Sequence, residues 1–238
     1  MPYRLLLLLG LVITSLPAFA AEEEEDDPFF GTISFGYLAT TGNTVTESLD
    51  TQADATYRTG RWEHNASGQA FRSSESNLTN AEYYTARWRS RWDITERDFL
   101  FGRLNWRKDR FGAFDTQFSQ TIGYGRRILT GPKHTLSAEV GAGARQSEDQ
   151  LGISLDETIL FGGLDYVWQF SDTANFSQEF TVEAGDENTF FESKSAVSAQ
   201  LIGALSLVAS YTIRSNSDVP VGTEKTDTQT GISLEYKF

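Results

Sequence analysis

The chain ends in Ile232-Ser233-Leu234-Glu235-Tyr236-Lys237-Phe238, and this stretch decides the fold class. Every second side chain in it is apolar, from Ile232 to the aromatic residue at the carboxyl terminus. Side chains of a β-strand alternate between its two faces, so the stretch predicts a strand with one apolar face and one polar face. The apolar face suits lipid or a protein core, and the polar face suits water.

The first twenty residues predict a signal peptide. Arg4 precedes an apolar run from Leu5 to Ile13, and Ala18-Phe19-Ala20 has the small-x-small pattern of a cleavage site, so Ala21 is the expected first mature residue. The apolar run is too short to span a bilayer, and the absence of cysteine excludes a lipidated amino terminus. An exported chain whose last strand ends in phenylalanine resembles bacterial outer-membrane barrels. This predicts the outer membrane of a Gram-negative bacterium, with both termini in the periplasm.

The composition fits a β-rich exported chain. Aromatic residues make up 13% of the 238 residues, and there are 20 glycines, 5 prolines and no cysteine. The net charge of −13 argues against nucleic acid as a partner, since phosphate binding needs a basic surface. The longest uncharged apolar stretch after residue 20, 201–209, is about half the length of a membrane helix. If the chain crosses a membrane, it must do so as the strands of a closed barrel, whose backbone groups are all paired in lipid.

Alternation and turn signals predict an all-β, membrane-spanning, antiparallel up-and-down β-barrel of about twelve strands. The expected domains are a signal peptide over 1–20, an acidic flexible leader over 21–28 and the barrel over 29–238. The leader carries the acidic run from Glu22 to Asp27 and is expected to be a solvated stub. The alternative is an acidic tail that recruits a cation or a basic periplasmic partner. The expected strands are 29–40, 44–57, 63–72, 81–92, 98–108, 114–127, 134–145, 156–169, 175–185, 189–201, 204–215 and 226–238.

Aromatic residues and connection lengths favour a membrane barrel over a soluble β-sandwich, which also alternates. The apolar phase carries aromatic side chains, most of them near strand ends as in an interfacial girdle: Trp88, Trp92, Trp106, Tyr124, Tyr166, Trp168, Tyr211 and Tyr236. The connections at 95–97, 130–132 and 171–173 are tight, and those at 73–80, 146–155 and 216–225 are long and polar. We expect the tight ones to be periplasmic turns and the long ones external loops, with the tight turn at 41–43 as an exception on the outer side.

Several short, glycine-rich motifs connect the chain with a known family. They are Gly36-Tyr37 followed by Thr41-Gly42-Asn43-Thr44, Lys108-Asp109-Arg110-Phe111, Ile122-Gly123-Tyr124-Gly125-Arg126-Arg127 and Glu139-Val140-Gly141-Ala142-Gly143. In this order the chain from Phe29 to Phe238 resembles the family catalogued as domain of unknown function 481. The resemblance implies an outer-membrane barrel that is induced by salt or acid, and it implies no catalytic residues.

Arginines alternate with tryptophans on two neighbouring expected strands. The arginine row consists of Arg87, Arg89 and Arg91, which alternate with Trp88, Ser90 and Trp92, and of Arg103 and Arg107, on either side of Leu104 and Trp106. If the tryptophans face lipid, all five arginines face the lumen, because an outward arginine near mid-membrane would cost about 2 to 4 kcal/mol. The acidic lumen candidates lie roughly across the expected barrel, at Asp165, Glu179, Glu183 and Glu192.

Two hypotheses follow for these charges. They either pair into a filled interior, or they form a basic wall and an acidic wall around a water-filled lumen that admits small polar or ionic solutes. Twelve strands lie between barrels of about eight strands, which side chains fill, and porins of about sixteen, which hold a channel. We predict a narrow passive channel, with a non-conducting structural or stress-response barrel as the alternative. The expected partners of this monomer are outer-membrane lipid and, during biogenesis, the barrel-assembly machinery.

An outer-membrane hydrolase is a further alternative, and it needs a histidine beside an amide or carboxylate. The two histidines, His64 and His134, are expected in the periplasmic connections before the third and the seventh strand. A calcium or magnesium site would need the acidic residues of 148–157 to converge: Glu148, Asp149, Asp156 and Glu157. Zinc and nucleotide sites lack their motifs. We therefore expect no enzyme activity, no cofactor and no metal, and we leave open an adhesion role for the external loops.

Overall fold

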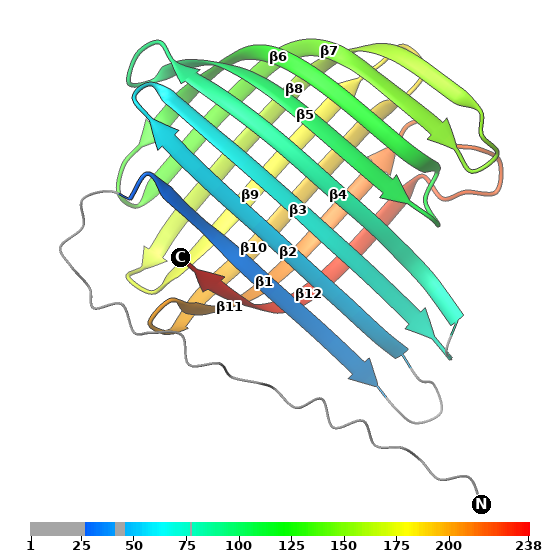
Figure 1. Cartoon of the computed structure of the whole chain (residues 1–238), viewed down its shortest axis with the longest axis horizontal. Helices are drawn as coiled ribbons and strands as arrows, with labels where there is room; N and C mark the ends of the chain where they lie inside the picture. The colour runs from blue at the N-terminus through cyan, green and yellow to red at the C-terminus, as the bar shows by residue number, and fades with distance from the viewer. Residues whose placement is uncertain (1–26, 41–45, 77) are drawn as a thin grey trace, which may run out of the picture.

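The computed structural model describes residues 27–40, 46–76 and 78–238, which form one closed barrel of antiparallel strands (Figure 1). Each strand pairs with its sequence neighbours, and β1 closes the barrel on β12. Among these residues no helix is long and apolar enough to span a membrane. The strands are β1 (Phe29–Thr40), β2 (Thr46–Thr59), β3 (Trp62–Glu75), β4 (Leu78–Asp93), β5 (Asp98–Asp109), β6 (Phe114–Thr130), β7 (His134–Asp149), β8 (Ser154–Ser171), β9 (Ala174–Ala184), β10 (Thr189–Ile202), β11 (Leu205–Asn216) and β12 (Thr226–Lys237).

The predicted fold class and number of strands are confirmed, but two connections predicted to be long are short. β3 continues to Glu75 and β4 begins at Leu78, where a loop at 73–80 was expected. β7 ends at Asp149 and β8 begins at Ser154, where a loop at 146–155 was expected. Polar residues extend these hairpins because their backbone hydrogen bonds continue whether the side chains face lipid or water.

Three sequence predictions fall outside the described residues. They are the signal peptide, the acidic leader up to residue 26 and the tight turn at 41–43. At the start of the described chain, the Pro28 carbonyl accepts a hydrogen bond from the backbone N–H of Arg58 at 2.8 Å. β1 therefore begins beside the end of β2. We call this end of the barrel, where β12 also finishes, the terminal end, and the opposite end the loop end.

The carboxyl-terminal residues close the barrel. β12 pairs with β1 from Lys237 opposite Thr32 to Leu234 opposite Phe35. Gly31 and Phe238 add two backbone hydrogen bonds of 2.9 and 3.0 Å. The stretch that decided the fold class is therefore the strand that joins the two ends of the sheet.

Exposure alternates along the strands with the period of two that the sequence predicted. On β12, Ile232 is 67% exposed and Leu234 is 47% exposed, whereas Ser233 between them is partly buried. Ile122 on β6 and Leu160 on β8 are also exposed outward, at 75% and 68%. The buried side chains are mostly polar or charged. The outside of this barrel is thus apolar and its inside is polar, which is the reverse of a soluble protein.

Glycines on β6 make room for an aromatic cluster inside the barrel. Phe99, Phe101 and Phe161 are buried together, and the rings of Phe101 and Phe161 meet edge to face with centroids 5.6 Å apart. A Cβ atom at Gly125 would overlap the Phe99 ring, and one at Gly123 would overlap the Phe101 ring. The glycines of the motif at 122–127 are therefore required by the packing of these inward rings.

Candidate functional site inside the barrel

All five residues of the arginine row point into the barrel. They are alternate residues of β4 and β5 whose side chains point inward, whereas Trp88 and Trp106 between them point outward and are exposed. In the cross-strand register, Arg89 lies directly opposite Arg103, and Arg87 lies opposite Asn105. The inward face of β4 and β5 follows from the outward orientation of Trp88 and Trp106, which is why the sequence could place these side chains.

Glu139 on β7 is the centre of the largest ion-pair cluster. Its side chain is 3% exposed, and it accepts a hydrogen bond of 2.8 Å from Nη2 of Arg91. Arg89 and Arg103 bring their Nη1 atoms to 3.6 and 3.7 Å from the same carboxylate. Asp165, which is 38% exposed, accepts hydrogen bonds of 3.3 Å from both Arg89 and Arg91. This cluster joins β4 and β5 to β7 and β8, across the interior.

A second cluster ties opposite walls of the barrel together through Glu192 on β10. Arg87 donates a hydrogen bond of 2.5 Å to Oε1 of Glu192, and Arg214 on β11 donates one of 2.6 Å to Oε2. Glu179 on β9 lies 3.6 Å from Nη1 of Arg87. The Arg87 and Glu192 side chains come from strands that are not neighbours in the sheet, so their contact crosses the lumen.

The remaining predicted residues have local partners. Arg107 pairs with Asp109 of its own strand at 2.5 Å. Glu183 pairs with Arg145 and not with the arginine row: it lies 3.6 Å from Nη1 of Arg145 and accepts a hydrogen bond of 2.8 Å from Ser119. Of the nine predicted charges, the structure therefore joins seven into the two clusters and leaves Arg107 and Glu183 in separate contacts.

Arg145 is the most buried charge in the described chain and holds the hairpin between β9 and β10. Its side chain is 1% exposed, pairs with Glu157 at 2.6 Å and donates to the Asn188 carbonyl. Oε1 of Glu157 accepts the backbone N–H groups of Glu187 and Asn188, both at 2.8 Å. Glu157 therefore takes part in a structural contact, and the described residues contain no group of three or more potential metal ligands.

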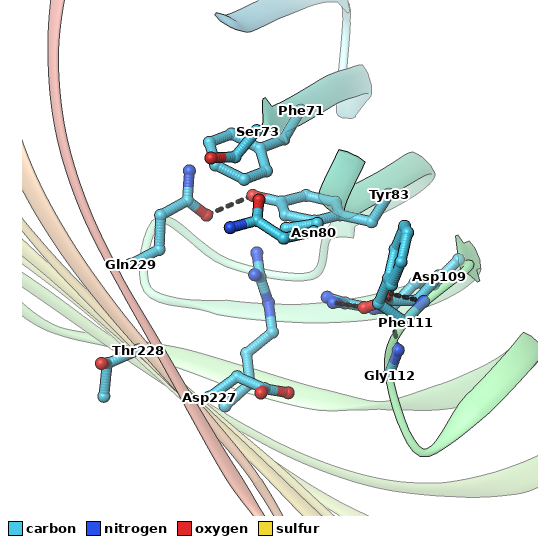
Figure 2. A pocket seen from close by; sticks show the side chains of 13 residues that line it. Phe71, Ser73, Asn80, Tyr83, Asp109, Phe111, Gly112, Asp227, Thr228 and Gln229 are labelled. Carbon is cyan, nitrogen blue, oxygen red and sulfur yellow. Dashed lines mark hydrogen bonds and ion pairs between the residues drawn. The ribbon is translucent and has the colours of Figure 1, made fainter. Parts of the chain in front are cut away.

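A vestibule of 310 Å³ opens at the loop end (Figure 2). At its wall the Tyr83 hydroxyl donates a hydrogen bond to Gln229, and the Tyr83 ring stacks on Phe71 with centroids 5.2 Å apart. The guanidinium groups of Arg107 and Arg214 both lie 4.8 Å from the centre of the Tyr83 ring. The vestibule thus combines aromatic faces with two arginines that are paired with Asp109 and Glu192.

Three further cavities follow one another inside the barrel. The middle one, of 210 Å³, shares Asp54, Arg87 and Glu179 with a cavity of 280 Å³ beside the arginine row. It shares Gln52 and Lys194 with a cavity of 200 Å³ that reaches the terminal end. A cavity of 360 Å³ at the terminal end is lined by residues of the β2–β3 turn and by Arg91.

The fold and the interior can now be compared with known proteins. The sequence profile of the family described as protein of unknown function DUF481 matches residues 33–238. The chain belongs to the DUF481 family. This confirms the resemblance carried by the glycine-rich motifs. A relative, the uncharacterized protein YdiY of Escherichia coli strain K12, is 34% identical over 214 residues, which cover 89% of this DUF481 chain and 84% of the relative.

Solved structures share the barrel of this DUF481 protein at low sequence identity. The NanC porin matches with a TM-score of 0.50 and 8% identity, over 87% of this chain and 97% of that chain. An outer membrane channel from Pseudomonas putida F1 matches with a TM-score of 0.53 and 9% identity, over 88% of this chain and 95% of that chain. At these identities the likeness shows the fold alone.

Sequence reasoning missed several charges of the DUF481 interior, among them Glu139, Arg145 and Arg214. Each belongs to the set of alternate residues of its strand that point into the barrel, so following this alternation along β7 and β11 would have identified them. Their partners could not be found in this way. Which charges meet across a lumen depends on the curvature and stagger of the whole barrel.

The positions expected for both histidines of the DUF481 chain need correction. His64 lies within β3 on its outward face, stacked between Trp62 and Trp88, with its Nδ1 atom 2.9 Å from Ser90 Oγ. His134 is the first residue of β7, and its Nδ1 atom lies 2.9 Å from the Tyr166 hydroxyl. Among the described residues neither ring bonds a carboxylate or an amide, so neither has the third member of a hydrolase triad.

Proposed function

We propose that this DUF481 chain is an outer-membrane barrel that holds a narrow, passive passage for small polar or ionic solutes. The membrane location is supported by the apolar side chains exposed all around the outside, such as Ile33, Ile122 and Leu160. Hydrocarbon would cover these faces, and a closed sheet satisfies its backbone groups without water. Trp62, Trp168 and other aromatic residues near the terminal end fit an interfacial girdle there.

The orientation and assembly of the barrel belong to the same proposal. Residues 1–20 are a cleaved signal peptide, both termini are periplasmic, and the loop end faces outward. The barrel-assembly machinery inserts the chain, which works as a monomer in outer-membrane lipid. These statements rest on the sequence patterns described above and on the general behaviour of exported barrels.

The observation that carries the passage is the row of three cavities that share lining residues. Their walls include small polar side chains from strands on either side of the closure, such as Ser34 on β1, Ser210 on β11 and Ser233 on β12. Arginines and aromatic rings instead fill the interior along β4 and β5. A solute would therefore move along the side formed by β1, β11 and β12 and meet the arginine row in the cavities of 210 and 280 Å³.

A layer of amide and carboxylate groups separates this row of cavities from the vestibule. Asp50 on β2 accepts hydrogen bonds from Gln52 at 3.1 Å, Gln69 at 3.0 Å and Gln229 at 3.4 Å. Gln229 in turn accepts a hydrogen bond from the Tyr83 hydroxyl. A path through this layer needs only rotation of neutral side chains against one carboxylate, whereas a path through the Glu139 cluster would break buried ion pairs.

The proposal is tested by current recordings in planar lipid bilayers under a potassium chloride gradient. The purified protein should give small, discrete conductance steps. The double variant Arg89→Glu and Arg103→Glu should move the reversal potential toward cation preference, because two positive charges inside the lumen become negative. Arg97→Glu, in the exposed turn between β4 and β5, is the control and should leave the reversal potential unchanged. Folded protein that gives no steps would contradict the passage.

A second candidate function, a non-conducting barrel that stiffens the envelope under ionic stress, is favoured by the Glu192 contacts. Arg87 on β4 reaches this 6% exposed carboxylate at 2.5 Å across the lumen, and Arg214 reaches it at 2.6 Å from β11, the strand next to β10. Such bridges resist deformation of the barrel whether or not it conducts. The absence of conductance, together with a loss of stability in Glu192→Gln, would support this function over the passage.

A further inference from the structure

We infer that the 280 Å³ cavity beside the arginine row binds a small zwitterion of the α-amino acid class. The cavity is lined by Arg89 and Arg103 together with Glu179 and Asn65. The inference deepens the proposed passage by naming a solute class, and it rests on that passage only for the solute's route. The binding site itself is argued from groups of both signs whose ion pairs within the protein are long and that make few hydrogen bonds.

The cationic half of the site is formed by two arginines that face each other. Arg89 and Arg103 are directly opposite in the register of β4 and β5, a placement that destabilises a sheet when like charges meet. Each guanidinium carries five N–H donors. Among the described residues, the Arg103 side chain donates no hydrogen bond, and its nearest carboxylate oxygen, on Glu139, is 3.7 Å away. Arg89 donates one hydrogen bond, of 3.3 Å, to Asp165.

A carboxylate of the solute would accept hydrogen bonds from the N–H groups that both arginines leave without an acceptor. Arginine binds carboxylates through two parallel N–H groups, and a carboxylate between two guanidinium groups also removes their mutual repulsion. The Arg103 guanidinium is held in place because it lies over the Phe161 ring, 4.6 Å from the ring centre. Its flat face is therefore occupied by the ring, while its N–H groups remain available to the cavity.

The anionic half of the site is Glu179. Its side chain is 36% exposed and accepts no hydrogen bond from another described residue, and its nearest cation, Arg87, lies 3.6 Å away. Glu192, by contrast, is 6% exposed and has two ion pairs of 2.5 and 2.6 Å. Arg87 thus forms its short hydrogen bond with Glu192, and the Glu179 carboxylate, with only a longer contact to Arg87, can accept hydrogen bonds from an ammonium group.

Only a ligand that carries both charges satisfies the two halves together. A simple anion would complete Arg89 and Arg103 but would be repelled by Glu179 and Asp165 in the same cavity. A simple cation would leave the remaining N–H groups of both arginines without an acceptor. The volume of 280 Å³ lies just below the range of about 300 to 1,000 Å³ usual for drug-sized ligands, so it fits a molecule as small as an amino acid.

Isothermal titration calorimetry on the detergent-purified protein tests this inference with three probes. Glycine carries both charges, acetate carries only the carboxylate, and methylammonium carries only the cation. Glycine should give saturable heat, with a Kd at least about tenfold lower than that of acetate or methylammonium. Arg103→Gln and Glu179→Gln should each raise the Kd for glycine about tenfold or more, which corresponds to the loss of one charge-assisted hydrogen bond. Arg97→Gln removes the same charge outside the cavity and should leave the Kd unchanged.

Each alternative outcome has a clear consequence. Equal affinity for glycine and acetate would overturn the inference in favour of a simple anion site, and no saturable heat from folded protein would overturn it in favour of a water-filled cavity. Folding is checked by faster gel migration of unheated samples, and Arg103→Lys tests the same contact if a glutamine variant does not fold. Glycine binding by a barrel without conductance would support the site and refute the passage, and conductance without glycine binding would do the reverse.

Discussion

Removing the charge of Glu139 should destabilise the barrel far more than removing the charge of Asp165. Both carboxylates contact Arg89 and Arg91, but the Glu139 side chain is 3% exposed and that of Asp165 is 38% exposed. In Glu139→Gln, Arg89, Arg91 and Arg103 lose a shared buried counter-ion, and breaking a buried pair costs about 3 to 5 kcal/mol. In Asp165→Asn, solvent screens the loss, so we expect about 1 kcal/mol or less.

Urea unfolding in lipid vesicles, followed by the fluorescence of the 5 tryptophans, measures both changes in one assay. The comparison is closely matched, because each variant replaces a carboxylate by the amide of the same shape and affects Arg89 and Arg91; Glu139→Gln also affects Arg103, at 3.7 Å. The reasoning predicts that the free energy of unfolding falls by at least about 2 kcal/mol more for Glu139→Gln than for Asp165→Asn. Equal losses would refute the claim that burial sets the strength of these pairs.

Three further predictions use matched pairs or a simple absence of activity. Gly143→Ala should lower the unfolding midpoint, because its Cβ would overlap a backbone carbonyl of β6, whereas Gly162→Ala has open space and should be nearly neutral in the same urea titration. Tyr83→Ala should raise single-channel conductance several-fold by opening the wall of the vestibule. Tyr84→Ala, on the outward face, should leave the conductance unchanged. Equal conductance of the two variants would instead indicate a filled interior. Purified protein and His64→Ala should show the same background rate of phospholipid hydrolysis, and activity above background that depends on His64 would contradict the non-enzymatic proposal.

Local periodicity was sufficient for the fold and for the orientation of the arginine row. The alternation at 232–238 and the alternation of Trp88 and Trp92 with the arginines of β4 each fix a face, because strand side chains repeat with a period of two. The resemblance to the DUF481 family was likewise visible in short motifs, whose glycines are now explained by inward aromatic rings such as Phe99.

Contacts across the lumen could not be predicted in the same way. The sequence gives no sign that Arg91 meets Glu139 or that Arg87 meets Glu192, because these pairs depend on the stagger and curvature of the closed sheet. The prediction of a long loop at 146–155 was wrong for a related reason. Its polar residues continue the hairpin of β7 and β8, and the backbone hydrogen bonds of a strand do not require apolar side chains.

The most direct test of the account is thiol labelling in lipid vesicles, which is straightforward because the chain has no cysteine. Ser210 on β11 lines the 200 Å³ cavity, and its neighbour Ala209 is exposed on the outward face. We predict that Ser210→Cys reacts with a small charged methanethiosulfonate reagent and that Ala209→Cys, covered by lipid, does not. Reaction at Ala209→Cys would contradict the membrane location, and an unreactive Ser210→Cys would contradict the aqueous passage.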